Sequence, residues 1–241
     1  MVAGRARVLT ATAPRYAIYF APAADSALWR FGSTTLGYDA ITGGEVPHTV
    51  PPGCEALDWP ALTAEPRRYG FHATLKAPFE LSHGRSEGAL RAFARNYVAG
   101  RAPVALAGLS VNALGHFIAL TPAEPSQALQ DFAFDVVQAF EPFRAPLSEA
   151  DLARRLQSPL TPAHRAYLEA FGYPYVGDAF RFHMTLTGAL PQDLVSPVKA
   201  TLAAAHAQAV PPGEVLLDRI AIFKQADRSS RFTLLDALPF G

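Results

Sequence analysis

The sequence contains only one cysteine, Cys54, in 241 residues. A single cysteine excludes an internal disulfide and a thiolate cage for a metal ion, so we expect a protein of the reducing cytoplasm. Net charge is also lacking, because 21 Lys and Arg residues balance 21 Asp and Glu residues. No global field draws such a chain to long nucleic acid or to an anionic membrane, so any polyanion that it handles is expected to be small or to be held by a local cluster.

A long uninterrupted apolar run is missing as well. Residues 102–123 contain no Asp, Glu, Lys or Arg, but Pro103 and Gly115 break the stretch, which predicts two strands around an Asn-Ala-Leu-Gly turn and no membrane span. Residues 1–14 offer no apolar segment of the length of a secretory signal, and we expect a disordered lead-in there. Half of the residues are apolar, enough for the core of one bilobed domain over residues 15–241.

Two segments with nearly the same wording stand out. Residues 71–75 read Phe-His-Ala-Thr-Leu and residues 182–186 read Phe-His-Met-Thr-Leu. Each segment lies in an apolar run that predicts a strand, and side chains two apart on a strand share a face. The His and Thr of each segment therefore project together, while their apolar neighbours face the core. This predicted chemical face consists of His72, Thr74, His183 and Thr185.

The order of elements around these motifs is also repeated. Each motif strand, predicted over residues 69–78 and 179–187, is followed by a helix and then by two strands. The separation in sequence between the motif histidine and the start of the next strand is the same in both halves, from His72 to Val104 and from His183 to Val215. This spacing indicates an internal duplication. We therefore predict an α+β fold of two pseudo-twofold-related lobes, with antiparallel sheets lining a central cleft and helices packed outside.

Local patterns predict the remaining elements. Arg15–Phe20 is typical of a first strand, residues 28–36 of a helix, and the proline-rich residues 42–66 of a long irregular connection. Further helices are predicted after the cap residue Ser86, over residues 129–140, after Ser148, from Thr161 to Gly172 and over residues 194–205, with final strands near residues 215–224 and 231–236.

Two imidazoles facing one substrate suit an in-line displacement at phosphorus. Imidazole, with an unperturbed pKa of about 6.5, accepts or donates a proton near neutrality. One ring can deprotonate the attacking water or hydroxyl while the other protonates the leaving oxygen, each contributing roughly 10²- to 10⁴-fold. The threonine hydroxyls on the same faces would donate to the charged oxygens. Which histidine is the acid depends on how the substrate is oriented.

Five further residues are candidate substrate contacts. Because side chains two apart on a strand share a face, Lys76 extends the first chemical face and Arg181 the second. These cations would neutralise phosphate oxygens, and the alternative is that they are solvated strand ends. Tyr19 either lines the cleft or packs in the core. Arg154 and Arg155 are neighbours on a predicted helix, so at most one of them faces the cleft, and a solvated face is the alternative for both.

The two motifs resemble those of the 2H phosphoesterase superfamily. The longer sequences around the two motifs are similar to those of the branch found with bacterial phosphonate-degradation operons, a branch of otherwise unassigned function. These sequences are Tyr-Gly-Phe-His-Ala-Thr-Leu-Lys at residues 69–76 and Phe-Arg-Phe-His-Met-Thr-Leu-Thr-Gly at residues 180–188, with Leu-Trp-Arg-Phe-Gly (28–32), Asp-Leu-Ala-Arg-Arg (151–155) and Gly-Tyr-Pro-Tyr (172–175) also fitting. The resemblance covers almost everything after about residue 15.

This resemblance implies two pseudo-symmetric α+β lobes whose motifs face a central groove. It also implies hydrolysis of a small cyclic phosphodiester without metal or cofactor, with the two motif histidines as acid and base and the two threonines as phosphate donors. The genomic association of the family suggests a ribosyl cyclic phosphate from phosphonate breakdown. One position departs from the family pattern, because Ala189 stands where an arginine is expected after the Thr-Gly pair.

Three alternatives stay open. An RNA-end 2′,3′-cyclic phosphodiesterase or ligase relative is one, although the lack of net positive charge weighs against long RNA. A protein that binds a cyclic phosphate or nucleotide without turnover would need the same two histidines as donors. A zinc site is the third, but zinc takes three or four protein ligands and no Asp, Glu or Cys lies within two residues of either motif histidine. The expected partner is thus a small phosphorylated substrate, and the sequence carries no prediction of the oligomeric state.

Overall fold

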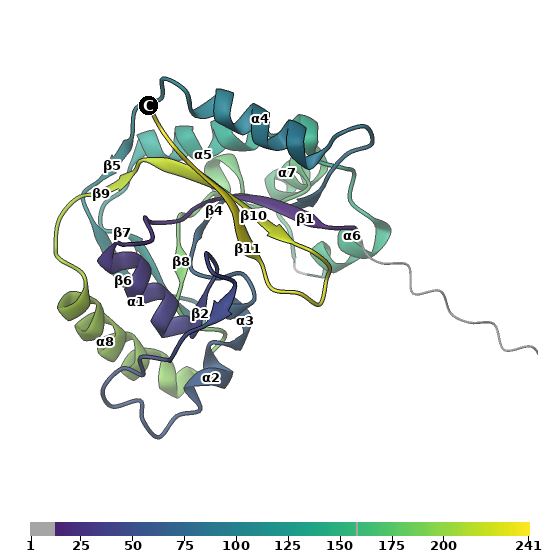
Figure 1. Ribbon diagram of the computed structural model, residues 1–241. Coiled ribbons are helices and arrows are strands. Elements are labelled where there is room, and N and C mark those ends of the chain that lie inside the picture. The colour runs from purple at the N-terminus through teal and green to yellow at the C-terminus, as the bar shows by residue number, and fades with distance from the viewer. Residues whose placement is uncertain (1–12, 158) are drawn as a thin grey trace, which may run out of the picture.

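The computed structural model describes residues 13–157 and 159–241, so the predicted lead-in over residues 1–14 lies outside the described residues except for its last two positions. A seven-stranded antiparallel sheet forms the centre of the fold (Figure 1). Across the sheet the strands run β11 (Thr233–Pro239), β10 (Arg219–Gln225), β1 (Arg15–Phe20), β4 (Ala73–Glu80), β8 (Met184–Thr185), β7 (Phe117–Pro122) and β6 (Leu109–Leu114). Two short ladders lie apart from it, β2 (Tyr38–Asp39) with β3 (Gly44–Glu45) and β5 (Val104–Leu106) with β9 (Val215–Leu217).

Helices cover the sheet from outside (Figure 1). They are α1 (Ala27–Leu36), α2 (Trp59–Leu62), α3 (Ala64–Arg67), α4 (Glu87–Val98), α5 (Gln127–Ala139), α6 (Glu149–Arg155), α7 (Pro162–Phe171) and α8 (Gln192–Ala209), with 3₁₀ turns η1 (Glu141–Phe143) and η2 (Gly177–Ala179). Helix α4 packs on β10 and β11, and α8 packs on β6 and β7 at the other end of the sheet. Among the helices of the described residues, none has both the length and the apolar character needed to cross a membrane.

The strand pairing carries the internal duplication. Strands β4 and β8 pair through Ala73 and Met184, the residues that follow the two motif histidines. Strands β5 and β9 pair around Ala105 and Leu216, which are separated in sequence by the same offset as the two motifs. Antiparallel pairing of a residue with its own equivalent is what a twofold axis between the two strands produces. Two separate ladders thus place a pseudo-twofold axis between the halves, which confirms the predicted duplication and fold class.

The repeat begins one strand earlier than the spacing of the motifs indicated. The order β10-β1-β4 on one side of the axis mirrors β6-β7-β8 on the other, with β11 added at one edge. Tyr19 on β1 pairs with Thr74 as Ala119 on β7 pairs with Thr185. The unit that starts at β1 and ends at β6 therefore corresponds to the unit from β7 to β10. The last strand of each unit is exchanged between the halves of the sheet: β6 pairs next to β7 and β8, and β10 pairs next to β1 and β4.

Most predicted elements are confirmed. Strand β1 has the predicted bounds, and the side chains of Ser86, Ser148 and Thr161 accept N-terminal hydrogen bonds of α4, α6 and α7. Gly172 ends α7 at a φ of 67°, in the left-handed region that glycine tolerates.

The motif strands were predicted too long. They cover Ala73–Glu80 and Met184–Thr185 rather than residues 69–78 and 179–187, so each motif histidine immediately precedes its strand. Strand β8 is short because only Met184 and Thr185 pair with the neighbouring strands β4 and β7. The predicted hairpin turn was also misplaced by a few residues, because β6 continues to Leu114 and turns at Gly115 and His116.

A close approach between α1 and the first motif fixes the segment that leads into β4. Phe71 is fully buried, and its ring lies edge-on to Trp29 with centroids 6.4 Å apart. A Cβ added to Gly32 would lie only 2.1 Å from Cγ of Phe71. The helix can therefore rest on this ring only because residue 32 has no side chain.

Replacing Gly32 by Ala should destabilise the protein. The added methyl group overlaps the Phe71 ring, and overpacking of this kind costs about 1–3 kcal/mol, more than the roughly 1 kcal/mol that alanine gains over glycine in a helix. Urea denaturation should show a lower free energy of unfolding for Gly32→Ala. Gly88→Ala in α4 is the matched control, since the nearest neighbour of its added Cβ is 3.9 Å away. An equal response of the two variants would contradict the close approach.

Candidate active site

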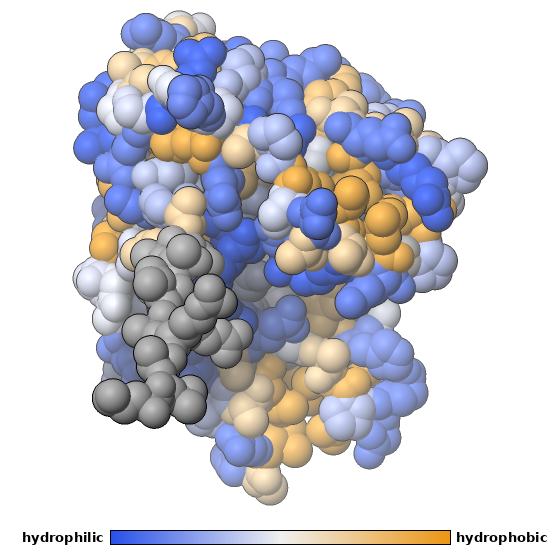
Figure 2. All heavy atoms as spheres, turned by 90° about the vertical axis from the view of Figure 1, so that its right-hand side faces the viewer, coloured by the Kyte–Doolittle hydropathy of each residue, from blue (hydrophilic) through white to orange (hydrophobic). Residues whose placement is uncertain are grey.

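A groove with a volume of about 600 Å³ opens where the two halves of the sheet meet. Figure 2 shows a hollow on the side of the molecule that carries α6, with hydrophilic residues in its depth. The lining of the groove includes the whole chemical face that the sequence predicted: His72, Thr74, His183 and Thr185.

The register at the pseudo-twofold axis explains this gathering. Because Ala73 pairs with Met184, continuing the antiparallel register sets Thr74 opposite His183, and likewise the other histidine opposite the other threonine. Side chains alternate between the two faces of a strand, so Ala73 and Met184 point into the core and are fully buried. The polar residues on either side of each point to the opposite face, into the groove.

Both motif histidines are held in the same tautomer. Nδ1 of His72 donates to the carbonyl oxygen of Gly70 at 2.9 Å, and Nδ1 of His183 donates to that of Arg181 at 2.8 Å. A carbonyl oxygen can only accept, so Nδ1 carries a proton in both rings, and a neutral ring then has its lone pair on Nε2. Gly70 and Arg181 are themselves equivalent positions, since each lies two residues before its motif histidine. The duplication thus leaves Nε2 of each imidazole as the atom that can gain or lose a proton.

His72 is the more enclosed of the two rings. Tyr19 stacks on it with centroids 3.8 Å apart and an interplanar angle of 22°, and its Nε2 lies 3.2 Å from the Thr74 hydroxyl. Burial lowers the pKa of His72 to about 4, the hydrogen bond to Gly70 acts in the opposite direction, and the charge of His183 lowers it further. Tyr19 therefore belongs both to the core and to the groove lining.

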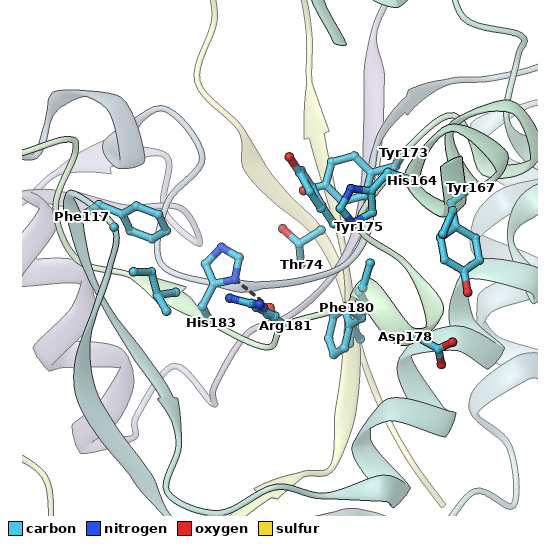
Figure 3. A pocket seen from close by; sticks show the side chains of 15 residues that line it. Thr74, Phe117, His164, Tyr167, Tyr173, Tyr175, Asp178, Phe180, Arg181 and His183 are labelled. Atoms are coloured by element: carbon cyan, nitrogen blue, oxygen red, sulfur yellow. Dashed lines mark hydrogen bonds between the residues drawn. The ribbon is translucent and has the colours of Figure 1, made fainter. Parts of the chain in front are cut away.

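His183 lies nearer to solvent, beside a second cavity of about 690 Å³ that adjoins the groove at Thr74 and His183. Phe117 on β7 approaches the His183 ring with centroids 5.9 Å apart. Figure 3 shows Thr74 between His183 and a group of aromatic side chains on the far wall. The sequence did not indicate the aromatic lining of the whole cavity, in which Phe117 lies next to His183 and the other members are His164, Tyr167, Tyr173, Tyr175 and Phe180.

Lys76 does not line the groove, which corrects the prediction. Its ammonium is buried on the opposite face of β4, where it bonds to the Val137 carbonyl at 3.0 Å and pairs with Glu141 at 2.7 Å. The cause is a β-bulge, because Ile18 of β1 pairs with Lys76 while the next residue, Tyr19, pairs with Thr74. One extra residue on β4 reverses the alternation beyond it.

The other predicted cations do reach the site. Arg181 is exposed and lines the aromatic cavity beside His183 (Figure 3). Arg154 and Arg155 both line the groove, but Arg154 is exposed and pairs with Asp151 at 2.7 Å. Arg155 instead lies over the ring of Tyr173, 5.0 Å from its centroid. Groove-lining residues without a local sequence signal are Arg15, Arg68, Tyr69 and Arg228, and Ala189 also lies there.

The described residues do not gather the side chains that a metal site needs. Within the described part of the chain, no group of three or more His, Cys, Asp or Glu side chains has an arrangement that could hold a metal ion. Cys54 is buried, with Sγ 3.3 Å from the hydroxyl of Thr201 on α8.

The chain belongs to a family described as "Protein of unknown function (DUF1045)", whose model matches residues 74–233. It is 35% identical over 237 residues to a "Ribose 1,5-bisphosphate phosphokinase PhnN" of Janthinobacterium sp. (strain Marseille), covering 97% of this chain and 52% of that protein. A protein of the same name from Laribacter hongkongensis (strain HLHK9) is 36% identical over 200 residues, covering 80% of this chain and 44% of that protein. The chain spans about half the length of these curated relatives.

Solved structures with a similar arrangement of elements share little sequence with this chain. The crystal structure of E. coli LigT complexed with 3′-AMP is 12% identical, with a TM-score of 0.42 and coverage of 94% of this chain and 97% of that one. The crystal structure of TT0787 of Thermus thermophilus is 16% identical, with a TM-score of 0.41 and the same coverages of 94% and 97%.

The enclosure of His72 predicts a titration that nuclear magnetic resonance can follow. One of the seven histidines should titrate with a pKa of about 4, and its signal should vanish in His72→Asn. Since folding lowers this pKa from an unfolded value of about 6.5, the stabilising contribution of the neutral ring is complete above pH 6.5 and is lost as the pH falls toward 4. A His72 signal that titrates near 6.5 would contradict the stacked, buried arrangement.

Proposed function

We propose that this protein hydrolyses a small cyclic phosphodiester by acid and base catalysis between His72 and His183, without a metal ion or cofactor. The observation that carries the proposal is the shared groove, which both motif histidines and both motif threonines line and in which both imidazoles are oriented by a hydrogen bond from Nδ1 to a carbonyl oxygen. The charge of one imidazole lowers the pKa of the other, which supports placing both against one substrate group.

The proposed reaction is an in-line displacement at phosphorus. The imidazole acting as base takes a proton from a water molecule, whose oxygen forms a new bond to phosphorus. The ester bond on the opposite side breaks, and its leaving oxygen takes a proton from the other imidazole. The product is an open phosphomonoester with a free hydroxyl group. Thr74 and Thr185 are positioned to donate to the phosphoryl oxygens as their charge grows.

The environments of the two rings favour one division of roles. A general base must be unprotonated before the reaction, and the low pKa of His72 keeps it neutral at pH 7. His183, which is nearer to solvent, then serves as the acid that protonates the leaving oxygen. After each turnover the two rings have exchanged protonation states, and proton exchange with water restores them.

A ribosyl cyclic phosphate is the substrate that we favour. The curated relatives bear the name of a kinase for ribose 1,5-bisphosphate. Opening 5-phosphoribosyl 1,2-cyclic phosphate at its 2-oxygen would give that same compound, so a hydrolase of this kind would supply such a kinase. We do not propose the kinase reaction for this chain, because a phosphate-binding loop needs a Gly-Lys step and each of its three lysines follows an apolar residue.

A 2′,3′-cyclic nucleotide or an RNA end is the second candidate substrate. The aromatic cavity beside His183 favours it, since stacking of a base on an aromatic ring contributes about 1–3 kcal/mol. Tyr173 and Tyr175, with ring centroids 5.5 Å apart, are the side chains best suited to that contact.

A substrate screen tests the proposal directly. Ring opening should be measured with excess chelator for ribose 1,2-cyclic phosphate, its 5-phosphorylated form, 2′,3′-cyclic nucleotides and RNA with cyclic ends. We expect turnover of at least one small cyclic phosphate, undiminished by the chelator. Tight binding of these compounds without any product would contradict hydrolysis and support a binding protein, whereas activity that disappears with chelator would contradict the metal-independent mechanism.

Removing either motif imidazole should abolish most of the turnover. We expect His72→Ala and His183→Ala each to lower kcat by about 10²-fold or more, with far-ultraviolet circular dichroism unchanged. His83→Ala is the matched control, because His83 is exposed in the loop after β4 and does not line the groove. Near-normal kcat in either motif variant would show that the acid and base lie elsewhere.

The pH dependence should separate the two roles. A plot of kcat/KM against pH should be bell-shaped, with the acid limb set by the pKa of about 4 of His72 in the free enzyme. His72→Gln should lose this acid limb, since the group whose deprotonation sets it is then absent. An acid limb that persists in His72→Gln would assign the base to another residue.

A further inference from the structure

We propose that the groove contains a second anion subsite, formed by Arg155 and Arg15, which binds a phosphate group of the substrate other than the one that reacts. This inference rests on the proposed function, because it specifies the substrate class further. The substrate is then a cyclic phosphodiester that carries a separate phosphate monoester.

Arg155 is the first side chain that requires a ligand. It comes from the C-terminal end of α6, lines the groove and lies over the Tyr173 ring. Its Nε atom is buried, yet no hydrogen-bond partner for it exists among the described residues. A buried N–H group of a cation without an acceptor is costly, and such groups are normally satisfied by protein, water or ligand. An anion bound in the groove would accept the hydrogen bond from Nε of Arg155.

Arg15 supplies a second cation on the same wall. Its Nε and Nη2 atoms donate to the amide oxygen of Gln225, a neutral partner, and its guanidinium lies 5.5 Å from the centroid of Phe232. Burial lowers the pKa of Arg15, and the charge of Arg228 lowers it further. Because the side-chain acceptor of Arg15 is a neutral amide, a bound anion would be a charged partner for this guanidinium.

The nearby carboxylates are already occupied. Across residues 13–157 and 159–241, neither Arg155 nor Arg15 lies within ion-pairing distance of a carboxylate. Asp151 is close enough to influence the pKa of both, but its two oxygens accept from Arg228 and Arg154. The two arginines of the subsite thus differ from Arg154 and Arg228, which pair with carboxylates of the protein itself.

The subsite is separate from the reacting centre. Besides the groove, Arg15 and Arg155 line a smaller cavity next to Ser148 and Asp151, and neither motif histidine lines that cavity. At the other side, the rings of Tyr19 and Tyr69 lie next to His72, with centroids 3.8 Å and 6.3 Å from that of the imidazole. A phosphate held by the two guanidiniums would therefore belong to a different part of the substrate from the cyclic phosphate.

This arrangement selects among the candidate substrates. Ribose 1,2-cyclic phosphate and a simple 2′,3′-cyclic nucleoside phosphate have no second phosphate and leave both guanidiniums unpaired. The 5-phosphorylated ribosyl compound carries a dianionic group about one sugar away from the ring that opens. Arginine suits it, because its planar fork binds phosphate through two parallel hydrogen bonds.

Substrate preference tests the subsite. The ratio of kcat/KM for 5-phosphoribosyl 1,2-cyclic phosphate to that for ribose 1,2-cyclic phosphate should be large in the parent protein. It should fall at least tenfold in Arg155→Gln and recover in part in Arg155→Lys. Arg165→Gln is the matched control, because it removes the same charge from an exposed position on α7 outside the groove. An unchanged ratio in Arg155→Gln would overturn the proposal.

Binding of ribose 5-phosphate provides a readout that does not depend on turnover. The parent protein and the double variant His72→Ala/His183→Ala should bind it with similar affinity in titration calorimetry, and Arg155→Gln should weaken that binding at least tenfold. Binding lost in the double variant but kept in Arg155→Gln would place the phosphate at the histidines and overturn the subsite. If no cyclic phosphate is hydrolysed although this binding pattern holds, the proposed hydrolysis fails while the anion subsite stands.

Discussion

The pairing of Ala73 with Met184 is the constraint on which the groove depends. Within the described residues it is the one ladder contact between β4 and β8, and it lies on the pseudo-twofold axis. Because the two strands run antiparallel through that point, the histidine of each motif is brought next to the threonine of the other motif. Four side chains contributed by segments far apart in the sequence thus meet with no loop needed to place them.

Duplication alone would give two identical histidines, and acid and base catalysis needs two different ones. The difference arises at a pair of equivalent positions on the neighbouring strands. Tyr19, opposite Thr74, stacks on His72 and encloses it, whereas the corresponding residue opposite Thr185 is Ala119. The second ring keeps only the looser contact with Phe117. One aromatic side chain therefore gives different surroundings to two histidines that the backbone holds in the same way.

Features of the fold and the site that depend on neighbouring residues could be predicted from the sequence, and features that depend on contacts between distant segments could not. The motif faces, the capped helices and the repeat depend on local periodicity and spacing, which the sequence displays directly. Lys76 was predicted on the wrong face of its strand. A β-bulge depends on the pairing with the partner strand, and a single extra residue reverses the faces that the alternation of side chains would otherwise give. The role of Arg15 was not predicted, because nothing in its own segment distinguishes it before the chain folds. Tyr173 and Tyr175 stand in a segment that fits the family, but their place in a cavity depends on contacts between segments far apart in the sequence.

The two ends of the groove make different demands on a substrate. The wall beside His72 offers guanidiniums, and hydrogen bonds to charged groups contribute about 1.5–3 kcal/mol each. The cavity beside His183 offers rings, where stacking contributes about 1–3 kcal/mol per base. These energies are similar, so burial decides between them. An aromatic ring needs no hydrogen-bond partner, whereas the buried Nε of Arg155 has no acceptor among the described residues. A substrate with a second phosphate would supply that acceptor at the proposed subsite, and a substrate with only a base would not.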